Sequence, residues 1–117
     1  MADKNNNAAN SQNSFRELQM LEQQFQSVLM QKQNAQIEQM EFTNAKEEVS
    51  KTQGEVYKIV GTAMILSDKK TILVELDQKL KNSQLRLETI QSQEKQLESR
   101  IAELQKEIQQ HLSRDKN

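Results

Sequence analysis

The chain has 117 residues, of which 34% are hydrophobic and 3% aromatic, so it offers little material for a rounded hydrophobic core. Its 16 basic and 17 acidic residues are mixed along the chain, which predicts no basic face for nucleic acid. Cysteine is absent, and this excludes disulfides and thiolate chemistry.

Residues 1–13 form a polar, Asn-rich segment, which we predict to be a disordered tail. It lacks the apolar core of a signal peptide, and no apolar run approaches the roughly 20 residues of a membrane span. We therefore expect a soluble, cytoplasmic protein with no membrane contact. Ser14, followed by Glu17, has the pattern of a capping box and predicts the start of a helix over 14–53.

A heptad pattern supports that first helix. Its ten seam positions fall in two sets spaced by seven residues, one from Leu18 to Lys46 and one from Leu21 to Val49. Seven of the ten are apolar. Gly54 then predicts the helix end as a C′ residue.

The segment 54–68 has the pattern of a β-hairpin. It holds two apolar runs on either side of Gly61-Thr62, and a glycine at the first position of a two-residue connection suits a type II′ turn. Ser67 or Asp68 would cap the helix that follows. The hairpin is apolar on both faces, which favours assembly with other subunits over a simple hydrophobic cap. The predicted oligomer-interface residues are Val56, Tyr57, Ile59, Val60, Ala63, Met64, Ile65 and Leu66.

A second helix is predicted over 69–112, with apolar residues at nine of twelve seam positions. If the chain turns back at Gly61, each seam position of the first helix lies opposite a seam position of the second helix, and Gln39 lies opposite Ser83. The fold class is therefore mainly α, a single domain formed by a long antiparallel two-helix coiled coil with one β-hairpin between the helices. The pattern also admits a parallel homodimer of either helix.

Catalytic chemistry has little support in the sequence. The single histidine, His111, lies at a late heptad position, and no nucleophile and base can be combined with it. We expect no enzyme activity, no cofactor and no metal site. At the end away from the hairpin, Met20, Leu29 and Met30 are apolar residues outside the seam, and Phe15 and Leu112 lie at its frayed end. They are either ordinary scatter or a surface for varied partners.

The hairpin motif 56-VYKIVG-61, the run 63-AMIL-66 and the Leu-rich helix from 73 to 104 resemble beta-type subunits of the prefoldin family, archaeal ones in particular. The segment 21-LEQQFQSVLMQKQNAQIE-38 is also similar to their first helix. One departure is Lys51-Thr52-Gln53-Gly54, where the family often has Pro-Asp or Asp-Asp before the hairpin.

The resemblance implies a hexamer of two alpha-type and four beta-type subunits, joined through their hairpins. It implies an ATP-independent holdase that captures unfolded proteins at the coiled-coil tips and delivers them to a group II chaperonin. The client-facing residues would then be Phe15, Leu18, Met20, Leu21, Leu104, Ile108 and Leu112. The alternative is a structural coiled-coil adaptor with one specific partner.

Overall fold

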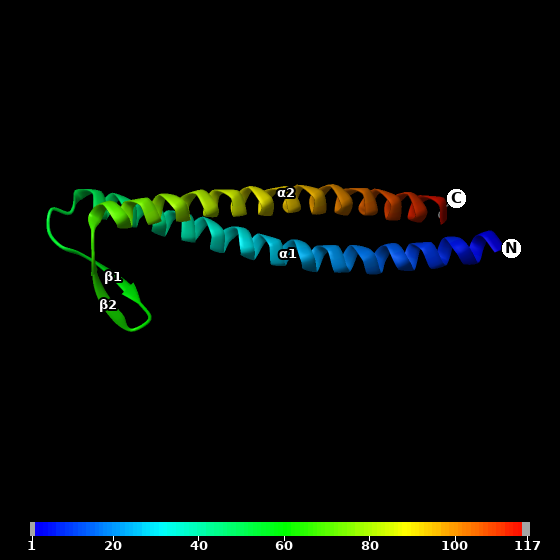
Figure 1. Cartoon of the computed structure of the whole chain (residues 1–117). Helices are drawn as coiled ribbons and strands as arrows, with labels where there is room; N and C mark the ends of the chain where they lie inside the picture. Colours follow the sequence, from blue (N-terminus) through cyan, green and yellow to red (C-terminus); the bar gives the residue numbers. More distant parts are fainter. Residues whose placement is uncertain (1, 116–117) are drawn as a thin grey trace. The chain divides into compact units, whose positions relative to one another are not determined.

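The computed structural model describes residues 2–115, and the side chains of residues 12–114. The elements follow in the order α1 (Ala2–Lys51), β1 (Val56–Val60), β2 (Ala63–Ser67) and α2 (Lys69–Asp115). Two long helices with a two-stranded antiparallel hairpin between them confirm the predicted fold class (Figure 1). The helices extend far because glycine occurs only at positions 54 and 61 and proline is absent.

The helix α1 begins earlier than the predicted boundary. Residues 2–13, predicted as a tail, belong to α1, and Met1 lies outside the described residues. Ser14 therefore lies inside the helix and is not its N-cap. A helix that is already formed gains one hydrogen bond for each residue added, and no glycine or proline interrupts this segment.

At its other end α1 stops at Lys51 without using Gly54 as a left-handed C′ residue, because Gly61 is the only glycine with positive φ. Thr52 closes the last turn instead. Its backbone N–H donates to the Val49 carbonyl at 3.2 Å, and its hydroxyl donates to the Glu48 carbonyl at 2.8 Å. These bonds satisfy carbonyls that a helix end leaves without partners.

The hairpin matches its prediction closely. Val60 pairs with Ala63 across Gly61-Thr62, and Gly61 has φ of 63°. Thr62 does not have positive φ, so the turn has the type II′ pattern and not the type I′ pattern. Asp68 then caps α2, because its carboxylate accepts hydrogen bonds from the Lys70 backbone N–H at 3.3 Å and the Thr71 hydroxyl at 3.0 Å.

The helices divide into two compact units. The hairpin unit spans 32–89, and the terminal unit contains the described parts of 1–31 and 90–117. In each unit a segment of α1 runs antiparallel to a segment of α2 (Figure 1). In the hairpin unit Gln39 donates a hydrogen bond to Gln84 at 2.7 Å, one residue away from Ser83, its predicted partner. Lys46 of α1 pairs with Asp77 of α2 at 2.6 Å.

The buried residues lie along the predicted seam. In the hairpin unit they are Ala35, Leu76, Ser83 and Leu87, and in the terminal unit they are Val28, Ile90, Leu104 and Ile108. All eight are heptad seam positions, so burial of apolar surface along one stripe of each helix stabilises both units.

Candidate functional site: an apolar hairpin and a helix groove

The hairpin exposes most of its apolar side chains. Of the eight residues predicted for the oligomer interface, Val56 is half-buried and the other seven are exposed. Ile59 is 72% exposed and Met64 68%, values that are high for large apolar residues in a folded chain. A two-stranded hairpin is only marginally stable in water, so this surface is suited to a partner.

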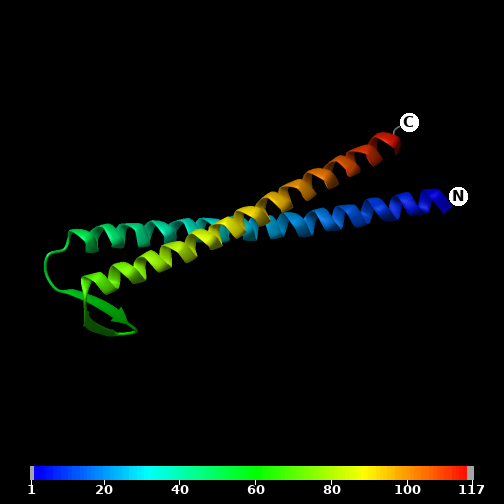
Figure 2. The ribbon, with the colours of Figure 1, turned by 45° about the horizontal axis from the view of Figure 1, so that its top comes forward.

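The hairpin is attached to α2, and α2 is attached to the end of α1 beside the hairpin's base. Lys58 Nζ lies 3.0 Å from the Glu75 carboxylate on α2. Lys69 Nζ donates to the carbonyls of Ser50 at 2.8 Å and Thr52 at 3.1 Å, at the end of α1. Both views show the hairpin turning back beside the first turns of α2 (Figure 1, Figure 2). These contacts hold the hairpin at the point where the two helices are joined.

In the terminal unit the predicted client-facing residues fall into three groups that differ in their exposure to solvent. Phe15, Met20 and Leu112 are exposed, by 47%, 60% and 53%. Leu18 and Leu21 are half-buried. Leu104 and Ile108 are buried in the helix seam, Leu104 to 1% exposure, so in this structure they join the helices and do not reach the surface.

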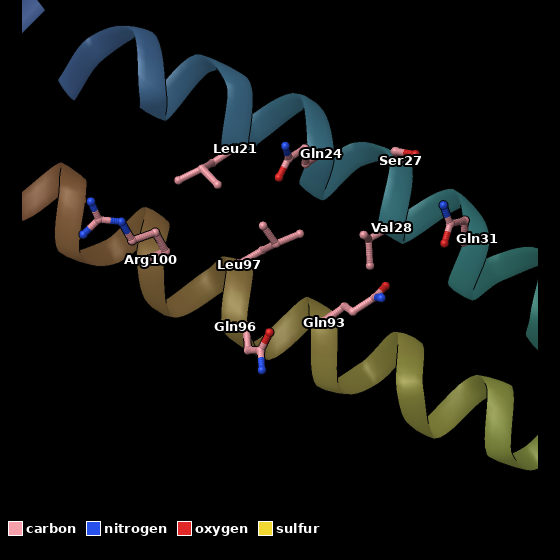
Figure 3. Close-up of a pocket in the computed structure, with 9 residues that line it drawn as sticks. All are labelled: Leu21, Gln24, Ser27, Val28, Gln31, Gln93, Gln96, Leu97 and Arg100. Atoms are coloured by element: carbon pink, nitrogen blue, oxygen red, sulfur yellow. The ribbon is translucent and has the colours of Figure 1, made fainter. Parts of the chain in front are cut away.

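A groove lies between α1 and α2 in the terminal unit (Figure 3). Leu21 and Val28 project from α1, and Leu97 projects towards them from α2. The remaining lining residues are polar, namely Gln24, Ser27, Gln31, Gln93, Gln96 and Arg100. The groove has a volume of about 480 Å³, within the range of small binding sites.

At one end of this groove Arg100 forms two ion pairs, which compensate the charge of its guanidinium group. Arg100 Nη2 lies 3.0 Å from Glu17 on α1, and Arg100 Nη1 lies 3.0 Å from Glu103 on α2. The hydrogen bonds to Glu103 and to Glu17 raise the pKa of Arg100, which stays charged. The groove therefore presents apolar side chains and neutral amides, which suit an uncharged occupant.

Sequence reasoning missed these ion pairs and the groove. The seam positions of Leu21, Val28 and Leu97 were predictable, but the pairing of long charged side chains depends on helix positions that a heptad count does not give. Pairs of oppositely charged residues beside the seam were the only available signal.

Sites for other chemistry are not formed in the described part of the chain. No group of three His, Asp or Glu side chains there is placed to hold a metal ion. Neither helix, over its described residues, contains a stretch long and apolar enough to cross a membrane. The arrangement defines the class of the protein: a helix–hairpin–helix chain with an exposed apolar hairpin between two antiparallel helices.

Comparison with known proteins identifies the family. Residues 12–114 match the prefoldin subunit family. The chain is 37% identical over 103 residues to prefoldin subunit beta of Methanothrix thermoacetophila, covering 86% of each chain. It is 38% identical over 95 residues to prefoldin subunit beta of Thermococcus onnurineus, covering 80% of this chain and 82% of that one.

A solved structure agrees with these relatives. The crystal structure of the prefoldin beta subunit from Thermococcus strain KS-1 superposes with a TM-score of 0.81 at 33% identity, covering 86% of this chain and 90% of that chain. The chain belongs to the prefoldin family. That family is one of chaperones and not of enzymes, so the chain has the function of a prefoldin chaperone subunit.

Proposed function

We propose that this chain is the beta-type subunit of an ATP-independent holdase, with two alpha-type and four beta-type subunits joined through their hairpins. The observation that carries the proposal is the exposed apolar hairpin between two antiparallel helices, in a chain 37% identical to a prefoldin subunit beta. In the same proposal the chain has no catalytic role and is located in the cytoplasm.

Client capture belongs, in this proposal, to the terminal unit. Phe15, Met20 and Leu112 supply exposed apolar contacts, and the groove beside Leu21 offers neutral amides to the backbone of an unfolded chain. Each contact is weak, but several subunits in one assembly act together, and their avidity exceeds that of any single contact. The client would then pass to a group II chaperonin that binds it more tightly, without nucleotide use by this chain.

A triple variant tests client capture in the full chain. Phe15→Ser, Met20→Ser and Leu112→Ser together remove the exposed apolar surface without touching a buried residue. The assembly with an alpha-type partner should keep its native mass, yet lose most of its ability to suppress aggregation of several unrelated denatured proteins.

The matched control is Met40→Ser with Leu85→Ser, since these residues are 58% and 62% exposed but belong to the hairpin unit. The control should hold clients like the unmodified chain. Equal loss in both variants would contradict a client site in the terminal unit, and retention of a single protein out of many would favour the adaptor alternative.

A further inference from the structure

Among the side chains that the structure describes, four methionines are exposed, and one of them differs from the rest in its location. Met20, Met30 and Met40 lie on α1, whereas Met64 lies on β2 of the hairpin. Their exposed fractions are similar, between 58% and 68%, so a peroxide in solution can reach all four thioether sulfurs. The four are therefore a matched set that differs mainly in what surrounds each sulfur.

The methionines of α1 have polar neighbours. Side chains three and four positions apart on a helix lie beside each other. Each of these methionines has at least two amide side chains at such positions, namely Gln23 and Gln24 for Met20, Gln26, Gln33 and Asn34 for Met30, and Gln36 and Asn44 for Met40. Because an amide donates hydrogen bonds, oxidation of these methionines to the sulfoxide adds an acceptor where donors are within reach.

Met64 lies on an apolar face of the hairpin. The register pairs Ile59 with Met64 and Tyr57 with Leu66, so the side chains of these four residues lie on one face. The one hydrogen-bond donor among them is the Tyr57 hydroxyl, which already donates to Glu55 Oε2 at 2.6 Å. A sulfoxide oxygen at position 64 therefore depends on water for its hydrogen bonds.

We propose that Met64 is a site of reversible oxidation by peroxide, and that its oxidation keeps a free subunit out of the assembly. The inference rests on the proposed function, in which other subunits cover the hairpin, and adds a control on entry into that assembly. Covering the hairpin removes water, so a sulfoxide at Met64 loses its hydrogen bonds, whereas the thioether has none to lose. Assembly in turn covers the sulfur and slows its oxidation.

The reaction is an oxygen transfer to sulfur. The thioether sulfur of Met64 attacks one oxygen of hydrogen peroxide, so an S–O bond forms and the O–O bond breaks. The other oxygen leaves as water after proton transfer, and the sulfur has lost the two electrons that the peroxide gains. A methionine sulfoxide reductase, with a dithiol as the reductant, returns the oxygen as water and restores the apolar side chain.

Peroxide treatment of the free full-length chain, followed by mixing with an alpha-type subunit, tests the effect on assembly. Oxidation should weaken assembly at least about tenfold, and treatment with the reductase should reverse this loss. Native mass across a dilution series, before and after peroxide, gives the fold-change for each variant. Met64→Leu has no sulfur to oxidise at this position, so its fold-change should be close to one.

The matched control is Met30→Leu with Met40→Leu, since these two residues are as exposed as Met64 but lie on α1. The control should lose assembly on peroxide treatment to the same extent as the unmodified chain. A control that is protected from peroxide, like Met64→Leu, would overturn the assignment to Met64.

Protection by assembly is a second measurement. Peroxide is added to the free chain and to the assembled complex, and mass spectrometry of peptides gives the oxidised fraction of each methionine over time. Oxidation of Met64 should slow in the complex, while Met30 and Met40 keep their rates. Equal rates for Met64 in the free chain and in the complex would contradict the inference.

The outcomes separate this inference from the proposed function. An unoxidised chain that forms no complex with an alpha-type subunit contradicts the proposed function. A chain that assembles, but is indifferent to peroxide or remains sensitive in the Met64→Leu variant, contradicts only the role of Met64.

Discussion

Ser83 is a small polar residue in the middle of an apolar helix seam. It is 6% exposed, and its hydroxyl has no hydrogen-bond partner in the structure. Its neighbour Gln84 receives a hydrogen bond from Gln39 of α1, so the amide of Gln39 is directed past Ser83 and not to it. A buried hydroxyl without a partner costs about 1–3 kcal/mol, which makes this position a weak layer of the hairpin unit.

Ser83→Ala should therefore raise the free energy of unfolding of the chain. The gain should be about 1–2 kcal/mol larger than that of Ser92→Ala, an exposed serine of the same helix. The control accounts for the intrinsic helix preference of alanine, about 0.5 kcal/mol. Urea unfolding followed by circular dichroism measures both values, and equal gains would mean that the Ser83 hydroxyl has a partner in solution.

Single residues were predictable where local geometry alone decides their role. Gly61 was assigned from its place in a two-residue turn, and it is found in that role. Ser67 and Asp68 were both candidates for the cap of the second helix, and the structure selects Asp68. The contacts of Arg100 and Lys69 were not predictable, because they join residues far apart in the sequence. Arg100 bonds Glu17, 83 residues away, and Lys69 bonds Thr52, 17 residues away, so the folded arrangement selects both partners.

Among the elements, the hairpin depends most on one backbone conformation. Gly61 has φ of 63°, whereas Gly54 has no positive φ. A Cβ atom at either position would meet nothing within 4 Å, so only the backbone distinguishes the two glycines. This makes them a matched pair for a test of the turn.

Gly61→Ala should destabilise the hairpin by about 1–2 kcal/mol, because an L-residue disfavours the left-handed region. Gly54→Ala should leave it unchanged or slightly more stable, since alanine restricts the unfolded chain. Amide hydrogen exchange over 56–67 reports hairpin opening directly. Faster exchange in Gly54→Ala than in Gly61→Ala would contradict the assigned turn.

The type and order of the helices and strands were predictable from the sequence, but the residues at which they begin and end were less so. Seam periodicity located both helices, since a heptad pattern over many turns is hard to satisfy by chance. The start of α1 was not located, because Ser14 and Glu17 form a capping pattern that is equally compatible with a helix interior. In the structure Glu17 pairs with Arg100 instead, a contact that only the folded chain creates.

At the scale of the whole molecule, charged groups contribute little to stability and to the proposed client contacts, and apolar surface contributes most. The net charge is −1, and the ion pairs that join the elements involve side chains about half exposed to solvent. Exposed pairs typically contribute about 0–1 kcal/mol each, and salt screens them. The proposed client contacts at Phe15, Met20 and Leu112 are apolar.

Client holding by the assembled chaperone should therefore change by less than about twofold when sodium chloride rises from roughly 0.05 to 0.5 M. Aggregation of a denatured protein, followed by light scattering at both salt concentrations, measures this. A steep loss of holding at high salt would show that charged groups, and not these apolar residues, capture clients.

The contact of Lys69 with the carbonyls of Ser50 and Thr52 has a consequence for the formation of the hairpin. It brings together the two ends of the segment that contains the hairpin, over a sequence separation of 17 residues from Thr52. Closing a loop of this length costs conformational entropy, and the Lys69 contact, together with the paired helices, offsets part of that cost for the two strands. The strands therefore pair within a loop whose ends are already held together, which favours re-formation of the hairpin after it opens.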